Sequence, residues 1–144
     1  MTARRKVAFA CYLVVLIEPL AFGLTYLLRS EFMPYHALAV GAPWNEVPDG
    51  YRVLILALMR IAGGGFAALA IALAFVLFGP FRRGEPWANV AIPAAGLVAS
   101  AGALYGTLYV RTHSAGRPPW EIVAAFMALI VVASALAREN GRTS

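Results

Sequence analysis

Four long apolar segments constrain the fold of this chain more than any other feature. They cover residues 7–28, 53–79, 87–110 and 119–137. Each approaches or exceeds the roughly 20 residues with which an α-helix crosses a hydrocarbon core about 30 Å thick. The sequence therefore predicts an all-α fold, an integral membrane four-helix bundle that forms a single domain over residues 1–144. Residues 30–52 would form an outer loop, and residues 138–144 a polar tail.

The first segment also has some features of a secretory signal peptide. Arg4, Arg5 and Lys6 form a basic start before the apolar run. Against cleavage stand the length of that run, the acid Glu18 inside it, and the lack of a convincing small-x-small cleavage site. We therefore expect the first segment to remain in the protein as a membrane span.

The basic residues predict how the chain lies in the membrane. With both termini on one side of a four-span protein, seven basic residues fall on that side and four on the other. Basic residues favour the cytoplasmic side. The sequence thus predicts a multi-pass protein of a bacterial cytoplasmic (inner) membrane, with both termini cytoplasmic, the lipid bilayer as a partner and no nucleic acid. The terminal side holds Arg4, Arg5, Lys6, Arg82, Arg83, Arg138 and Arg142, and the other side Arg29, Arg52, Arg111 and Arg117.

The loop at residues 30–52 carries too many apolar side chains for a freely solvated linker. We expect it to fold back over the bundle mouth, with a short helical turn near Tyr35 to Val40. Each tryptophan, Trp44, Trp87 and Trp120, follows a proline at or near an expected helix start. Tryptophan favours the membrane interface, so Pro-Trp is expected to fix helix starts there.

Small residues mark the faces through which the helices could pack. The second segment contains Gly63, Gly64 and Gly65, and the third contains Gly102 and Gly106 at GxxxG spacing. Small-xxx-small faces let helix backbones approach closely in lipid. Two alternatives remain at this point: packing inside one bundle, or contact with a membrane-protein partner or a second copy of the chain.

Two charged residues, Glu18 and Arg60, lie well inside the spans. Such residues normally face a protein interior, a partner or a water cavity. Counted from the outer ends of their segments, Glu18 lies about 15 Å deep and Arg60 about 10 Å deep, a difference that an arginine side chain can cover. The sequence predicts a buried pair in a pocket that opens outward. Pro19 leaves the carbonyl of Val15 without an N–H donor beside the acid.

Three roles remain open for Glu18. It could form a structural ion pair with Arg60, act as a proton- or ligand-responsive carboxylate in transport or sensing, or contact another membrane subunit. All three follow from the cost of placing charge inside a membrane.

Further candidate binding residues lie near the outer ends of the segments. Tyr105, Tyr109, Arg111 and His113 belong to the stretch YGTLYVRTH, which could line the outer pocket and hold an anionic or aromatic ligand. The alternative is a set of interfacial tyrosines with a snorkelling arginine.

His36 in the loop is the second candidate histidine. With Glu31, Glu46 or Asp49, the histidines have donor types that suit zinc. No tight spacing such as HxxxH supports such a site, so the sequence predicts neither a metal nor a cofactor.

Catalytic motifs are missing from the sequence. It contains no GxSxG, P-loop, HExxH or CxxC motif, and Cys11 is its single cysteine. We therefore expect no enzyme and no catalytic residues. The predicted function is a ligand- or partner-binding membrane module or an accessory subunit, with a proton-coupled small-molecule transporter using Glu18 as the alternative.

Two resemblances accompany this prediction. Glu18 in the first of four helices resembles the carboxylate that small multidrug resistance exporters share between protons and cationic drugs. The long first loop, the greater length, Pro19 and Arg60 depart from that family. The stretch ALMRIAGGGFAALAIAL and the four-span plan resemble small bacterial inner-membrane proteins of the DoxX type, which implies a fold and a location but no substrate.

Overall fold

The computed structural model describes residues 1–138 and confirms the all-α fold class. Within these residues, four helices are long and apolar enough to cross a membrane. The predicted tail beyond Arg138, with Arg142, lies outside the described residues. The elements are α1 (Ala3–Leu28), α2 (Pro34–Val40), the short 3-10 turn η1 (Trp44–Glu46), α3 (Asp49–Val76), the π-helical turn η2 (Leu77–Phe81), α4 (Ala88–His113) and α5 (Trp120–Arg138).

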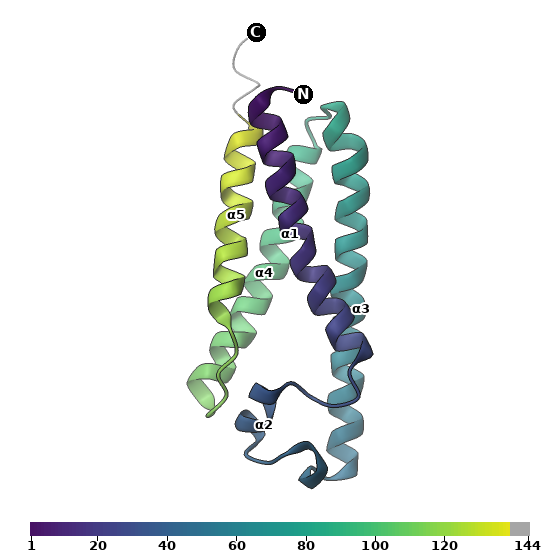
Figure 1. Ribbon diagram of the computed structural model, residues 1–144, viewed down its shortest axis with the longest axis vertical. Helices are drawn as coiled ribbons and strands as arrows, with labels where there is room; N and C mark the ends of the chain where they lie inside the picture. The colour runs from purple at the N-terminus through teal and green to yellow at the C-terminus, as the bar shows by residue number, and fades with distance from the viewer. Residues whose placement is uncertain (139–144) are drawn as a thin grey trace.

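The end of the bundle that carries the chain termini is closely packed. The start of α1, the end of α5 and the turn between α3 and α4 lie together there (Figure 1). Arg5 is only 9% exposed, and its guanidinium donates to the Phe81 carbonyl at 2.6 Å while lying 4.5 Å from the centre of the Phe81 ring. The buried core at this end consists of Ala8, Tyr12, Leu16, Leu73, Leu77, Phe81, Ala88, Ile92, Ala133 and Ala137.

The third helix continues further than the sequence suggested. The predicted segment ends at residue 79, yet a π-helical turn, Leu77–Phe81, carries the chain on through Pro80. A π turn widens the helix locally, and proline has no N–H to offer the usual helical acceptor. Gly84 then reverses the chain with a φ of 89°.

Helices α1 and α3 are antiparallel neighbours that cross most closely at Gly23 and Gly63. A Cβ atom built on Gly23 would lie 2.8 Å from the Gly63 carbonyl oxygen. Eighteen residues separate Gly23 from Arg5, and eighteen separate Gly63 from Phe81. The two contacts therefore define one register along the pair of helices.

The opposite end of the bundle is covered by the loop at residues 30–48. Helix α2 lies across this end, where α4 and α5 diverge from α3 (Figure 1). The predicted helical turn is confirmed, because α2 spans Pro34–Val40. Phe32 and Val47 are buried against Met59 of α3, and Trp44 packs edge-on against Phe32 with ring centres 4.9 Å apart. The loop is thus an ordered cap.

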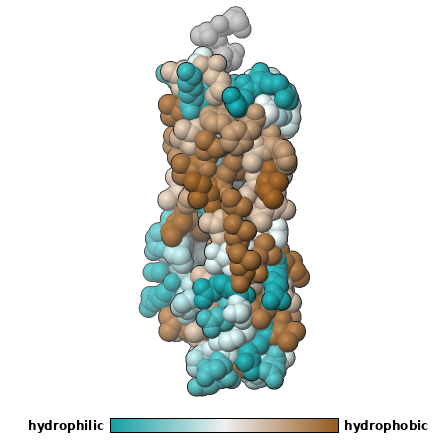
Figure 2. Space-filling view, turned by 45° about the vertical axis from the view of Figure 1, so that its right-hand side comes forward, coloured by the Kyte–Doolittle hydropathy of each residue, from teal (hydrophilic) through white to brown (hydrophobic). Residues whose placement is uncertain are grey.

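The hydropathy of the surface agrees with a spanning bundle. The face drawn in Figure 2 shows apolar side chains over the middle of the molecule and hydrophilic ones toward both ends. Apolar side chains that face outward suit a hydrocarbon solvent. The structure is therefore compatible with a multi-pass membrane protein.

Candidate ligand-binding cavity

A cavity of about 650 Å³ lies between the long helices and the cap. All four long helices and α2 contribute to its wall. Most lining side chains are apolar, and the polar ones described are Glu18, Thr25, Tyr26, Tyr35, His36, Ser100 and Thr107. Cavities of this size and composition bind drug-sized small molecules in many proteins.

Small residues on α4 create much of this space. Gly96, Ala99, Ala103 and Gly106 face the cavity instead of filling it with side chains. Of the two glycines, Gly96 approaches α5, since a Cβ there would lie 3.1 Å from Cδ1 of Ile130, whereas a Cβ on Gly106 would meet nothing within 4 Å.

The glycine faces expected to pack are used unequally. Gly63 forms the close crossing with α1, whereas Gly64, Gly65, Gly102 and Gly106 meet no atom within 4 Å of an added Cβ. The GxxxG pair of α4 therefore does not join two helices within the described chain. A contact with a second copy or another membrane protein through this face stays a prediction.

Among the described residues that line the cavity, Glu18 carries the single formal charge when the imidazole of His36 is neutral. It is half-buried near the middle of α1. Pro19 follows it inside the continuous helix and also lines the cavity, as does Val15, whose carbonyl Pro19 cannot serve as a donor. The adjacent acid and proline of α1, Glu18 and Pro19, thus both lie on the cavity wall.

The expected pair between Glu18 and Arg60 is not formed, which corrects the sequence-based prediction. Within residues 1–138 no ion pair joins them, and Arg60 is absent from the cavity wall. Thirteen residues separate Glu18 from Arg5, but twenty-one separate Arg60 from Phe81. In the register set by the Arg5–Phe81 contact, the two charges therefore differ by eight residues, about 12 Å along the helices.

The rotation of α3 also keeps Arg60 away from the cavity. The side of α3 that is buried carries Met59, Gly63 and Ala70, and Arg60 lies on the exposed side. The depths predicted for Glu18 and Arg60 from the sequence were wrong, because α3 begins at Asp49 and extends beyond the end of α1. The ends of α1 and α3 next to the cap lie at different heights, so equal numbers of residues from those ends do not mean equal depths.

A polar aromatic cluster forms the end of the cavity next to the cap. The hydroxyl groups of Tyr26 and Tyr35 share a hydrogen bond of 2.9 Å. The ring centres of Tyr35 and His36 lie 4.4 Å apart, and His36 Nδ1 accepts the Met33 backbone N–H at 3.3 Å. Burial lowers the pKa of His36 and raises the pKa of Tyr35. Both side chains are therefore uncharged at neutral pH.

The other four sequence candidates lie outside the cavity. Tyr105 is 71% exposed, Tyr109 is also exposed, and neither lines the wall. His113 stacks on Tyr109 with ring centres 4.1 Å apart, and Arg111 is exposed on the same helix. His113 and His36 thus belong to separate sites. Within residues 1–138, no three His, Cys, Asp or Glu side chains gather in a group able to hold a metal ion.

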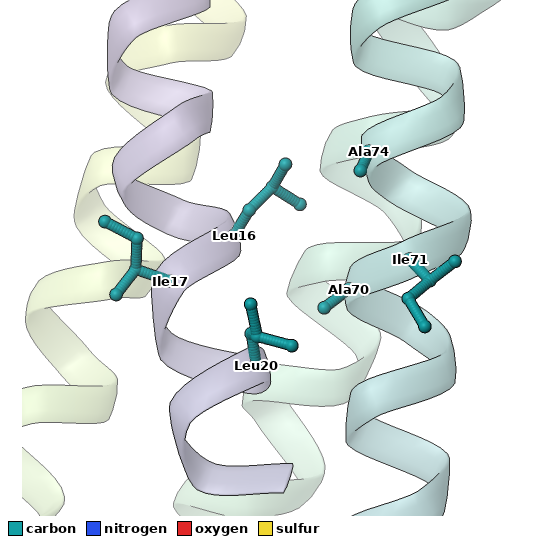
Figure 3. A pocket seen from close by; sticks show the side chains of 6 residues that line it. All are labelled: Leu16, Ile17, Leu20, Ala70, Ile71 and Ala74. Carbon is teal, nitrogen blue, oxygen red and sulfur yellow. The ribbon is translucent and has the colours of Figure 1, made fainter. Parts of the chain in front are cut away.

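A second, smaller hollow of about 180 Å³ lies between α1 and α3. Figure 3 shows Leu16 and Leu20 of α1 on the side facing Ala70 and Ala74 of α3. Its lining residues are all apolar aliphatic, completed by Ile17 and Ile71. The hollow offers no group that would orient a polar ligand, so the larger cavity is the candidate site.

Sequence reasoning identified Glu18 and His36 but missed Tyr26, Tyr35 and the small residues of α4 as parts of one site. Spacing alone gave no signal, because Tyr26 and Tyr35 meet only after the cap folds back. Comparisons with protein-family models, curated proteins and solved structures find no match to this chain. The functional assignment therefore rests on the cavity itself.

Proposed function

We propose that this protein is a noncatalytic membrane module that binds a lipophilic organic cation, with Glu18 as the counter-charge. One observation carries the proposal: Glu18 stands on the wall of a large, mostly apolar cavity, and no lysine or arginine of residues 1–138 lines that cavity. A carboxylate in such a place must be neutralised by a proton or by a cation. An apolar cation would neutralise the Glu18 carboxylate and also contact the apolar side chains of the cavity wall.

For location, we propose a bacterial cytoplasmic membrane with the termini in the cytoplasm. The excess of basic residues at the terminal end supports this orientation. In this orientation, the packed core lies toward the cytoplasm, and the polar aromatic cluster lies toward the outer surface.

Tetraphenylphosphonium and tetraphenylborate provide a direct test, because they match in shape and differ in the sign of charge. Equilibrium dialysis against the purified protein in uncharged micelles, with empty micelles as the baseline, measures saturable binding. We expect the cation to bind and the anion not to bind. Glu18→Gln should weaken cation binding more than tenfold, a loss of over about 1.4 kcal/mol.

Glu46→Gln is the matched control, since Glu46 is an exposed acid outside the cavity. It should leave cation binding unchanged. Equal binding of the two ions, or equal losses in the two variants, would overturn the proposal.

The second candidate is a proton-coupled transporter in which a proton and the cation compete for Glu18. The same unpaired carboxyl group supports it. It predicts proton release when tetraphenylphosphonium binds, and flux into proteoliposomes that is driven by a pH gradient and abolished by Glu18→Gln. Binding without proton release, together with no flux, would exclude the transporter and leave the binding module.

A further inference from the structure

The ligand cavity has polar groups at two separate levels. Glu18 lies near the middle of α1, and Tyr26 lies eight residues further along the same helix. At 1.5 Å per residue, their backbone positions differ by about 12 Å along the helix axis. Both residues line one continuous cavity.

The wall between these levels is aromatic and apolar. Phe22 packs against Tyr26 with ring centres 4.2 Å apart and meets Phe66 of α3 edge-on at 5.3 Å. Phe126 of α5 lines the same cavity. A ligand that fills it therefore needs an apolar middle between its polar ends.

The outer level supplies hydrogen-bond donors and no formal charge. Two tyrosine hydroxyls carry two protons, and the bond between Tyr26 and Tyr35 uses one of them. The other proton has no acceptor among the described residues. Because Nδ1 of His36 accepts the Met33 N–H, the neutral ring carries its proton on Nε2. The cluster thus offers two donor protons, one on Nε2 of His36 and one on a tyrosine hydroxyl, and all three side chains line the cavity.

From this arrangement we infer that the outer cluster of Tyr26, Tyr35 and His36 is a second recognition point, which binds an uncharged hydrogen-bond acceptor about 12 Å from the ligand's cationic nitrogen. The ligand class is an elongated organic cation with a carbonyl, amide or ether at its far end. The neutral state of His36 and Tyr35 favours such a group over a carboxylate or phosphate. This inference rests on the proposed role of Glu18.

Decyltrimethylammonium and its derivative with a terminal carboxamide test the inference. Both carry the cation and the apolar chain, and only the derivative carries the distant acceptor. The measured quantity is the ratio of their dissociation constants for the purified protein in uncharged micelles. We expect the carboxamide to bind about tenfold more tightly, as the net gain from one or two buried hydrogen bonds allows.

Two pairs of variants make this ratio specific to the cluster. Tyr35→Phe and His36→Phe should each reduce the ratio toward one, because each alters the donors that the carboxamide would meet and should weaken carboxamide binding more than decyltrimethylammonium binding. The controls Tyr109→Phe and His113→Phe remove the same groups from a stacked pair outside the cavity, and should keep the ratio. Tyr35→Phe keeps the hydrogen bond from the Met33 backbone N–H to Nδ1 of His36. This variant therefore still tests the inference if His36→Phe fails to fold.

The two proposals fail in different ways. Glu18→Gln should weaken both probes equally and leave their ratio intact, so an unchanged affinity for decyltrimethylammonium would overturn the role of Glu18. A wild-type ratio near one would overturn the second recognition point alone. A ratio lowered equally by the control variants would do the same.

Discussion

Gly23 of α1 and Gly63 of α3 face each other so closely that neither position has room for a side chain. A Cβ on Gly23 would lie 2.7 Å from the Ala67 nitrogen, and one on Gly63 would lie 2.7 Å from the Gly23 carbonyl oxygen. The obstructing atoms belong to backbone, which cannot rotate out of the way. This crossing sets the register that separates Glu18 from Arg60.

Alanine at the crossing should therefore destabilise the bundle. Gly23→Ala and Gly63→Ala should each cost about 1–3 kcal/mol, the usual range for overpacking, despite the better helix propensity of alanine. Thermal unfolding in detergent measures the effect. Gly64→Ala is the control, because a Cβ there meets nothing within 4 Å, and it should cause no loss. Equal stability of all three variants would contradict the close crossing.

Arg5 should anchor α1 to the turn between α3 and α4. Arg5→Ala removes a buried hydrogen bond from a charged donor to Phe81 and the packing on its ring. The expected loss is about 1.5–3 kcal/mol of unfolding free energy. Lys6→Ala, at an exposed neighbouring position, should change stability little. If the two variants unfold alike, the Arg5 anchor contributes nothing.

Glu85 should make the turn before α4 sensitive to acid. Its carboxylate accepts from Arg83 Nε at 2.8 Å and from Trp87 Nε1 at 2.7 Å, and the hydrogen bond from Arg83 lowers its pKa. A lowered folded-state pKa means that the stabilisation is present above the ordinary value and is lost as the pH falls through the folded value. The stability difference between wild type and Glu85→Gln should shrink as the pH is lowered from 7 to 3. A stability difference that stays constant over this pH range would contradict the proposed acid sensitivity of Glu85.

His36 should weaken the cap when it becomes protonated. Burial lowers the pKa of His36 below the ordinary histidine value of about 6.5, so the neutral form is favoured in the folded state. The stability contributed by neutral His36 is therefore present above about pH 6.5 and is lost as the pH falls through the lower pKa of His36 in the folded state. NMR should show His36 titrating below 6.5 and protection of the Met33 amide, corrected for intrinsic exchange, falling with it. In His36→Phe, that protection should no longer depend on pH in this range, and persistence of the dependence would assign it to another group.

Local sequence properties were sufficient to predict the spans and the cap. The length and hydropathy of each segment act on one helix at a time, and the apolar residues near Phe32 and Trp44 required a surface to cover. The depth comparison of Glu18 and Arg60 failed for the opposite reason. It needed the relative height and rotation of two helices, which depend on contacts between residues far apart in the sequence.

The sequence by itself determined an all-α chain with four helices long and apolar enough to cross a membrane, a carboxyl group inside the first of them and a loop that folds back as a cap, because hydropathy and helix length are local quantities. The tertiary structure alone decided which side chains share a cavity. The Gly23–Gly63 crossing and the Arg5–Phe81 contact fix α3 against α1, while small residues on α4 leave space beside them. Backbone contact between residues forty positions apart thus directs Glu18 toward the cavity and leaves Arg60 outside it.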